Sequence, residues 1–184
     1  PLNLELAATP EMVTLALNST PNMAMIVPEG RDEVTTEGGL DVAGDIDRLR
    51  EIVKSLRDGG MRVSAFVDAD KNQIDAVLDS GFTVCEIHTG PFAESFIRND
   101  FSHLHPDVLL ERDKVRIAVQ HAIEIGLQCN AGHGLTHRNV TGISSIPEIT
   151  ELHIGHSIIS RSVIVGMQNS VREMKKQIKD SSNG

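Results

Sequence analysis

Short apolar runs alternate along the chain with longer runs whose apolar residues recur at helical spacing. This alternation is typical of βα units and of a parallel sheet. The short runs predict six strands, at residues 3–7, 23–27, 61–67, 83–88, 126–130 and 151–154. The longer runs predict helices at residues 10–18, 44–58, 71–80, 107–125 and 157–179, with a short helix after Thr136. No internal repeat or linker interrupts the pattern, so we expect a single domain over residues 1–184.

The sequence marks some of the connections between strands and helices more clearly than others. Thr9 is expected to be the N-cap of the first helix, because Pro10 suits its first position and Glu11 its first turn. Residues 88–106 instead predict a long connection between a strand and the next helix. Loops of this length are commonly functional or mobile.

Several of the predicted strands carry polar residues, although strands of a parallel sheet are covered on both faces. By the two-residue period, Glu86 and His88 share one face of their strand, and Gln128 and Asn130 share one face of theirs. Glu5 lies in the first strand in the same way. A buried lone carboxylate is costly, so we expect these groups inside a barrel, near the carboxyl ends of its strands, where barrel enzymes bind substrates. A structural ion pair or a water-bound role is the alternative for each glutamate.

Composition narrows the class of protein. The chain has 17 Lys+Arg against 26 Asp+Glu, a net charge of −9, and it has no Trp and no Tyr. Nucleic acid is therefore not an expected partner. Cys85 and Cys129 lack the spacing of a disulfide framework or a zinc site, which favours a cytoplasmic protein. No apolar stretch approaches the roughly 18 residues of a membrane span, so no membrane association is expected.

Two loops near the C-terminus predict a phosphate site. Gly132 and Gly134 flank His133 between a strand and a helix, which lets backbone amides approach an anion and places the imidazole at an exposed tip. The alternative is a glycine turn with a surface histidine. Gly155 and His156 end the last strand and open the last helix. Barrels commonly bind phosphate with their last two loops, although close packing at Gly155 and a capping role for His156 are alternatives.

Other candidate chemistry is weaker. Residues 27–41 form a long connection with two threonines and several glycines, which predicts a substrate lid or else a solvated loop. His133 and His137 are four residues apart but lack the glutamate of a metalloprotease motif, and His103 and His105 offer less. We therefore expect no metal site.

Five segments of the chain resemble the pyridoxine 5′-phosphate synthase family. They are Asn3-Leu4-Glu5 and residues 34–42 (VTTEGGLDV), 86–90 (EIHTG), 130–135 (NAGHGL) and 154–156 (IGH). The resemblance covers essentially all 184 residues, and a complete eight-stranded α/β barrel has roughly 250. It implies a TIM (β/α)8 barrel, N-terminally truncated to about six βα units, that starts at the third strand.

The resemblance also implies a reaction and roles for residues. The family condenses 3-amino-2-oxopropyl phosphate with 1-deoxy-D-xylulose 5-phosphate to give pyridoxine 5′-phosphate, phosphate and water, without a cofactor. Glu5 would accept a proton and His133 would donate one. Thr35 would bind the deoxyxylulose phosphate, and His133, Gly134, Gly155 and His156 would bind the amino-ketone phosphate. Glu86, His88 and Asn130 are expected to support them, and a homo-octamer is the expected assembly.

Part of the family's pattern has no counterpart in these residues. The family's first two βα units supply a catalytic histidine and arginines that bind substrate phosphate. We therefore expect the 184 residues to be a fragment that is inactive alone. Another phosphate-binding barrel aldolase or isomerase is an alternative, as is a truncated barrel without catalysis.

Overall fold

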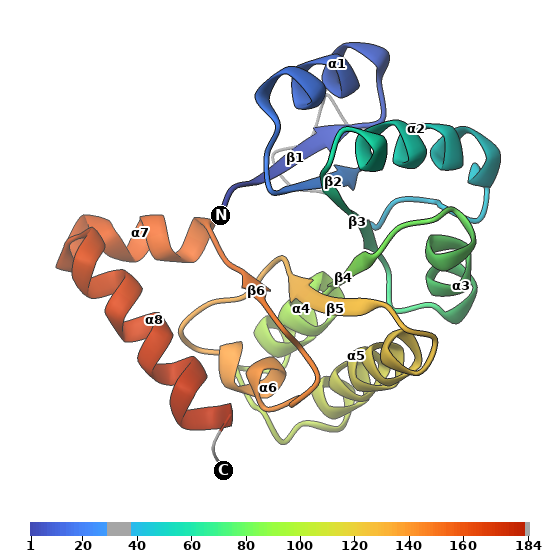
Figure 1. Cartoon of the computed structure of the whole chain (residues 1–184). Helices are drawn as coiled ribbons and strands as arrows, with labels where there is room; N and C mark the ends of the chain where they lie inside the picture. Colours follow the sequence, from blue (N-terminus) through green and yellow to red (C-terminus); the bar gives the residue numbers. More distant parts are fainter. Residues whose placement is uncertain (29–37, 183–184) are drawn as a thin grey trace.

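The computed structural model describes residues 1–28 and 38–182, and within them it confirms a parallel sheet of six strands. The strands are β1 (Asn3–Ala7), β2 (Met23–Val27), β3 (Arg62–Val67), β4 (Val84–His88), β5 (Gln128–Gly132) and β6 (Leu152–His153). They lie in the order β1-β2-β3-β4-β5-β6, and each pairs in parallel with the next. The sheet is curled, with helices between its strands, as in a TIM barrel (Figure 1).

Helices follow the strands in chain order (Figure 1). They are α1 (Pro10–Ser19), α2 (Ile46–Asp58), α3 (Lys71–Asp79), α4 (Gly90–Arg98), α5 (Pro106–Glu124), α6 (Val140–Ser144), α7 (His156–Val165) and α8 (Met167–Ser182). The expected start of α1 is confirmed, because Thr9 Oγ1 accepts a hydrogen bond of 3.3 Å from the amide of Met12. The α/β class with alternating strands and helices is therefore confirmed.

The apolar core lies between one face of the sheet and the helices. Alternate strand residues such as Ile26, Ala65 and Ile87 are fully buried there. Helix residues such as Leu49 and Val119 cover them. The two free cysteines, Cys85 and Cys129, lie in register on this face with their sulfur atoms 3.8 Å apart. The other face of the sheet carries the polar strand residues, such as Glu86 and Asn130.

Two segments differ from the sequence prediction. The connection predicted at residues 88–106 contains helix α4, whose side chains Phe92 and Phe96 are buried. The single helix predicted at residues 157–179 is two helices, α7 and α8, which are separated at Gly166, where φ is 82°. Figure 1 shows them as a helical hairpin beside β6. A residue with positive φ ends a right-handed helix, and glycine adopts that conformation without steric cost.

The strand register places the polar residues on one face, as predicted. Glu86 of β4 lies opposite Asn130 of β5, and His88 lies opposite Gly132. Gly132 in turn lies opposite His153 of β6. Because side chains alternate along a strand, all of these residues point to the face opposite the helices. The register thereby gathers carboxylate, imidazole and amide groups on the concave side of the sheet.

Candidate functional site

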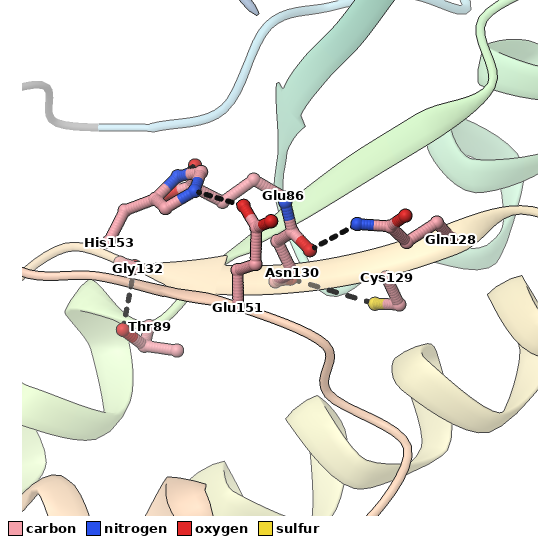
Figure 2. Close-up of polar contacts among 8 residues, drawn as sticks. All are labelled: Glu86, Thr89, Gln128, Cys129, Asn130, Gly132, Glu151 and His153. Carbon is pink, nitrogen blue, oxygen red and sulfur yellow. Dashed lines mark hydrogen bonds and ion pairs between the residues drawn. The ribbon is translucent and has the colours of Figure 1, made fainter. Parts of the chain in front are cut away.

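Glu86 and His153 form the central ion pair of the concave face. Glu86 is 3% exposed, and its Oε2 pairs with Nδ1 of His153 across β5. The residue between them is Gly132, and a β-carbon there would collide with the Glu86 carboxylate. His153 Nε2 lies 3.4 Å from Glu151 Oε2, so the imidazole contacts both carboxylates (Figure 2). The glycine therefore makes room for a buried charge pair.

The two carboxylates keep His153 protonated. Burial alone would lower the pKa of this imidazole, but the hydrogen bond and charge of Glu86, followed by those of Glu151, raise its pKa to about 9. His153 is therefore a cation at neutral pH and balances the buried charge of Glu86.

This pair predicts a dependence of stability on pH. The ordinary pKa of the His153 imidazole is about 6.5, and in the folded chain it is about 9. A raised pKa stabilises the fold fully below the unfolded value, and this stabilisation is lost as the pH rises through the folded value. We expect the free energy of unfolding to fall by at most about 3 kcal/mol between pH 6.5 and pH 9. Urea denaturation measures this slope, and His153→Gln should flatten it.

Glu5 belongs to the same electrostatic cluster, although its side chain is exposed. It lies on β1 and points to the concave face, in register with Met25. The pKa of Glu5 is raised by partial burial and by the negative charge of Glu86, while the charge of His153 opposes the rise. A carboxylate with a raised pKa is a better proton acceptor at neutral pH than an ordinary one.

His88 and His133 form a second group at the carboxyl ends of the strands. The rings lie edge to face with centroids 5.0 Å apart, and Phe66 packs against both. His88 is buried, and its Nδ1 lies 2.9 Å from Oδ1 of Asp68. This contact lowers the pKa of the Asp68 carboxyl. The carboxylate thus fixes the orientation of the His88 ring.

His133 is half-buried, so the expectation of an exposed tip was wrong. Burial and the nearby His88 lower the pKa of the His133 imidazole, while Glu86 and Glu94 raise it less. The physical reason is that β4 and β5 are neighbours, so the ends of both strands bring their histidines together.

Amide side chains continue the polar face away from the histidines. Asn130 is fully buried, and its Oδ1 accepts a hydrogen bond of 3.1 Å from Gln128 Nε2 (Figure 2). Gln128 Oε1 accepts one from Arg62 of β3. Asn130 therefore lies beside Glu86 but not in contact with the histidine pair through any hydrogen bond recorded for the described residues.

The two loops of the predicted phosphate site are joined. Ser157 Oγ donates a hydrogen bond of 2.8 Å to the carbonyl oxygen of Leu135. Gly134 has a φ of 72° and is exposed, as are Gly155 at the N-cap of α7 and His156 in its first turn. Thr35 lies outside the described residues. Backbone amides at loops and helix starts can bind phosphate.

The sequence missed two residues of this site. Asp68 lies directly after β3, and its position at the carboxyl end of a strand was the available signal. His153 was not predicted as part of the site, because its partner Glu86 is 67 residues away. Among residues 1–28 and 38–182, no group of three or more His, Cys, Asp or Glu side chains is arranged to hold a metal ion. No helix in these ranges is both long and apolar enough to cross a membrane.

Comparison with known proteins identifies the family. The family model described as "Pyridoxal phosphate biosynthesis protein PdxJ" matches residues 1–180. The chain belongs to the PdxJ family. Pyridoxine 5'-phosphate synthase of Aromatoleum aromaticum is 49% identical over 181 residues, which are 98% of this chain and 72% of that protein. The enzyme of the same name from an Azoarcus species is 48% identical over 183 residues, which are 100% of this chain and 74% of that protein.

A solved structure supports the barrel-like fold of this PdxJ family member. The xylose isomerase domain protein from Planctomyces limnophilus superimposes with a TM-score of 0.55, over 96% of this chain and 71% of that protein. Its sequence identity of 10% means that the likeness concerns the fold alone.

Proposed function

We propose that this protein acts as a pyridoxine 5′-phosphate synthase, joining 3-amino-2-oxopropyl phosphate to 1-deoxy-D-xylulose 5-phosphate with release of phosphate and water. The observation that carries the proposal is the cluster of Glu5, Glu86 and His153 on the concave face, beside His88 and His133. Membership of the PdxJ family supports it. Imine formation and dehydration both move protons, and the cluster offers carboxylates and imidazoles for that work.

Glu5 is the proposed proton acceptor and His133 the proposed proton donor. The raised pKa of Glu5 suits it to take up a proton near neutral pH. The lowered pKa of His133 makes its protonated form a stronger acid than an ordinary imidazolium. Glu86 and His88 are proposed to orient Glu5 and His133 and to influence their pKa values through their charges, with Asn130 beside them.

The proposed phosphate ligands are Gly134, Gly155 and His156, which the Ser157–Leu135 hydrogen bond holds on joined loops. Thr35 is proposed to bind the deoxyxylulose phosphate. No cofactor is required, a homo-octamer is the proposed assembly and the cytoplasm the proposed location. These proposals follow the family resemblance.

Substrate binding to the 184-residue chain tests the function, because the resemblance places further substrate ligands outside these residues. We expect 1-deoxy-D-xylulose 5-phosphate and inorganic phosphate each to raise the melting temperature. A ligand at one hundred times its Kd stabilises a protein by about 2.7 kcal/mol. His156→Ala should weaken phosphate binding without unfolding the chain, since His156 is exposed. No shift with either ligand would contradict the proposal.

Borohydride trapping tests the alternative that the protein is a Schiff-base aldolase. A Schiff-base aldolase needs a lysine at the site, and strands β1 to β6 contain none. We therefore expect no covalent adduct with a carbonyl substrate after reduction.

A further inference from the structure

Thr89 has an unusual position for a helix-capping threonine. It is the N-cap residue of α4, but its side chain makes no capping hydrogen bond. The fully buried hydroxyl instead lies 2.6 Å from the carbonyl oxygens of both Gly132 and His133. The amide of Thr89 also donates to the Gly132 oxygen, at 2.8 Å. Figure 2 shows the side chain beside the end of β5.

The two carbonyls meet at one hydroxyl because the chain turns sharply at His133. Its φ is 80°, in the left-handed region that residues other than glycine rarely adopt. Such a conformation persists only when its surroundings enforce it. The amide of Thr89 donates to the Gly132 carbonyl, which leaves the single hydroxyl proton for the carbonyl of His133. Thr89 therefore holds the carbonyls on both sides of His133 and enforces this backbone conformation.

The same contact sets the direction of the Gly134 amide. The carbonyl of His133 and the N–H of Gly134 belong to one planar trans peptide, in which the two groups point in opposite directions. Because Thr89 holds that carbonyl, the Gly134 N–H points away from Thr89. Gly134 packs closely against α4, since a β-carbon there would lie 2.7 Å from the Ala93 side chain.

We propose that Thr89 is a positioning residue for the reaction, whose hydroxyl orients the His133 imidazole and the Gly134 amide together. The inference rests on the proposed function, which gives His133 and Gly134 their roles as proton donor and phosphate ligand. Thr89 acts through the backbone and does not touch substrate. A single hydroxyl thereby couples proton transfer to phosphate binding.

The titration of His133 reports its position. The groups that face it are His88 and Glu86 from β4, Glu94 from α4 and the Phe66 ring from β3. Burial and the charge of His88 lower the pKa of His133. If Thr89 no longer holds the turn, the ring gains freedom to leave this environment, and its pKa should rise toward the ordinary value of about 6.5.

The decisive comparison is Thr89→Val against Thr89→Ser, in the 184-residue chain. Valine keeps the shape of threonine without the hydroxyl, whereas serine keeps the hydroxyl. We expect nuclear magnetic resonance to show a raised pKa of His133 in Thr89→Val and an unchanged one in Thr89→Ser. Thr83→Val is the matched control, because Thr83 directly precedes β4, which Thr89 directly follows, and its hydroxyl makes a long contact of 3.5 Å with the carbonyl of Val63.

Phosphate affinity is the second readout. We expect Thr89→Val to weaken the binding of inorganic phosphate about tenfold, and Thr89→Ser to weaken it less than about threefold. An unchanged His133 titration in folded Thr89→Val overturns the inference. A wild-type chain that does not bind phosphate contradicts the proposed function, but the His133 titration still tests Thr89.

A measurement on the wild-type chain covers the case in which Thr89→Val does not fold. The buried hydroxyl proton of Thr89 should exchange slowly with water and give nuclear Overhauser contacts to His133. A rapidly exchanging proton would overturn the inference.

Discussion

Glu86→Ala is expected to lower the free energy of unfolding by about 3–5 kcal/mol at pH 7, because it breaks the buried ion pair with His153 from one side. Glu86 and His153 are mostly buried, with 4% and 21% of their side chains exposed. Removing the carboxylate also removes the main interactions that raise the pKa of His153, while the burial that lowers it remains. Urea denaturation measures the loss of stability, and imidazole resonances measure the fall of the pKa.

Glu151→Gln is the matched control for this prediction. Glu151 contacts the same imidazole from the other side, at 3.4 Å, but 48% of its side chain is exposed. Exposed ion pairs contribute about 0–1 kcal/mol, so this variant should lose little stability. Glu86→Gln should lie between the two, and its deficit should shrink at pH 10, where His153 is neutral in both proteins. Equal effects of Glu86→Ala and Glu151→Gln would contradict the central role of the buried pair.

The sequence predicted the concave polar face because strand periodicity alone sets which side chains share a face. Glu86 and His88 were assigned to one face from their spacing, and the same reasoning applied to Asn130. Parallel pairing in chain order then brought these faces together, as the register shows. No long-range information was needed for this step.

Contacts between segments that are distant in the chain could not be predicted from the sequence. The pairing of Glu86 with His153 depends on the missing side chain of Gly132, and the Asp68–His88 contact depends on two adjacent strand ends. Neither partner is encoded by a spacing along the chain. Helix α4 was missed for a related reason, since Gly90 and Pro91 at its start read locally as a turn but also suit the first turn of a helix.

The prediction that His133 is exposed was wrong for a reason that bears on function. A glycine on each side predicted a protruding loop. Packing against Phe66 and His88 instead draws the ring inward and lowers its pKa. The site therefore combines a carboxylate with a raised pKa and an imidazole with a lowered one, so both shifts move the two pKa values toward each other.

Glu5→Gln is expected to reduce product formation by about 10²–10⁴-fold in a form of the enzyme that turns over, because a positioned acid or base contributes roughly that factor. Glutamine has nearly the same shape but cannot accept a proton. Glu5 is exposed and makes no hydrogen bond recorded among the described residues, so the melting temperature should stay unchanged. Pyridoxine 5′-phosphate formation and thermal unfolding, measured on the same sample, separate the two effects.

The pH dependence of the rate strengthens this test. The ordinary pKa of a glutamate is about 4.3. Because burial and the charge of Glu86 raise the pKa of Glu5, the acid limb of the wild-type rate profile should lie above that value. Glu5→Gln should abolish this limb together with the rate, whereas Glu51→Gln, an exposed glutamate on α2, should alter neither. Near-normal turnover by Glu5→Gln would exclude Glu5 as the proton acceptor and would leave Glu86 as the remaining carboxylate at the centre of the concave face.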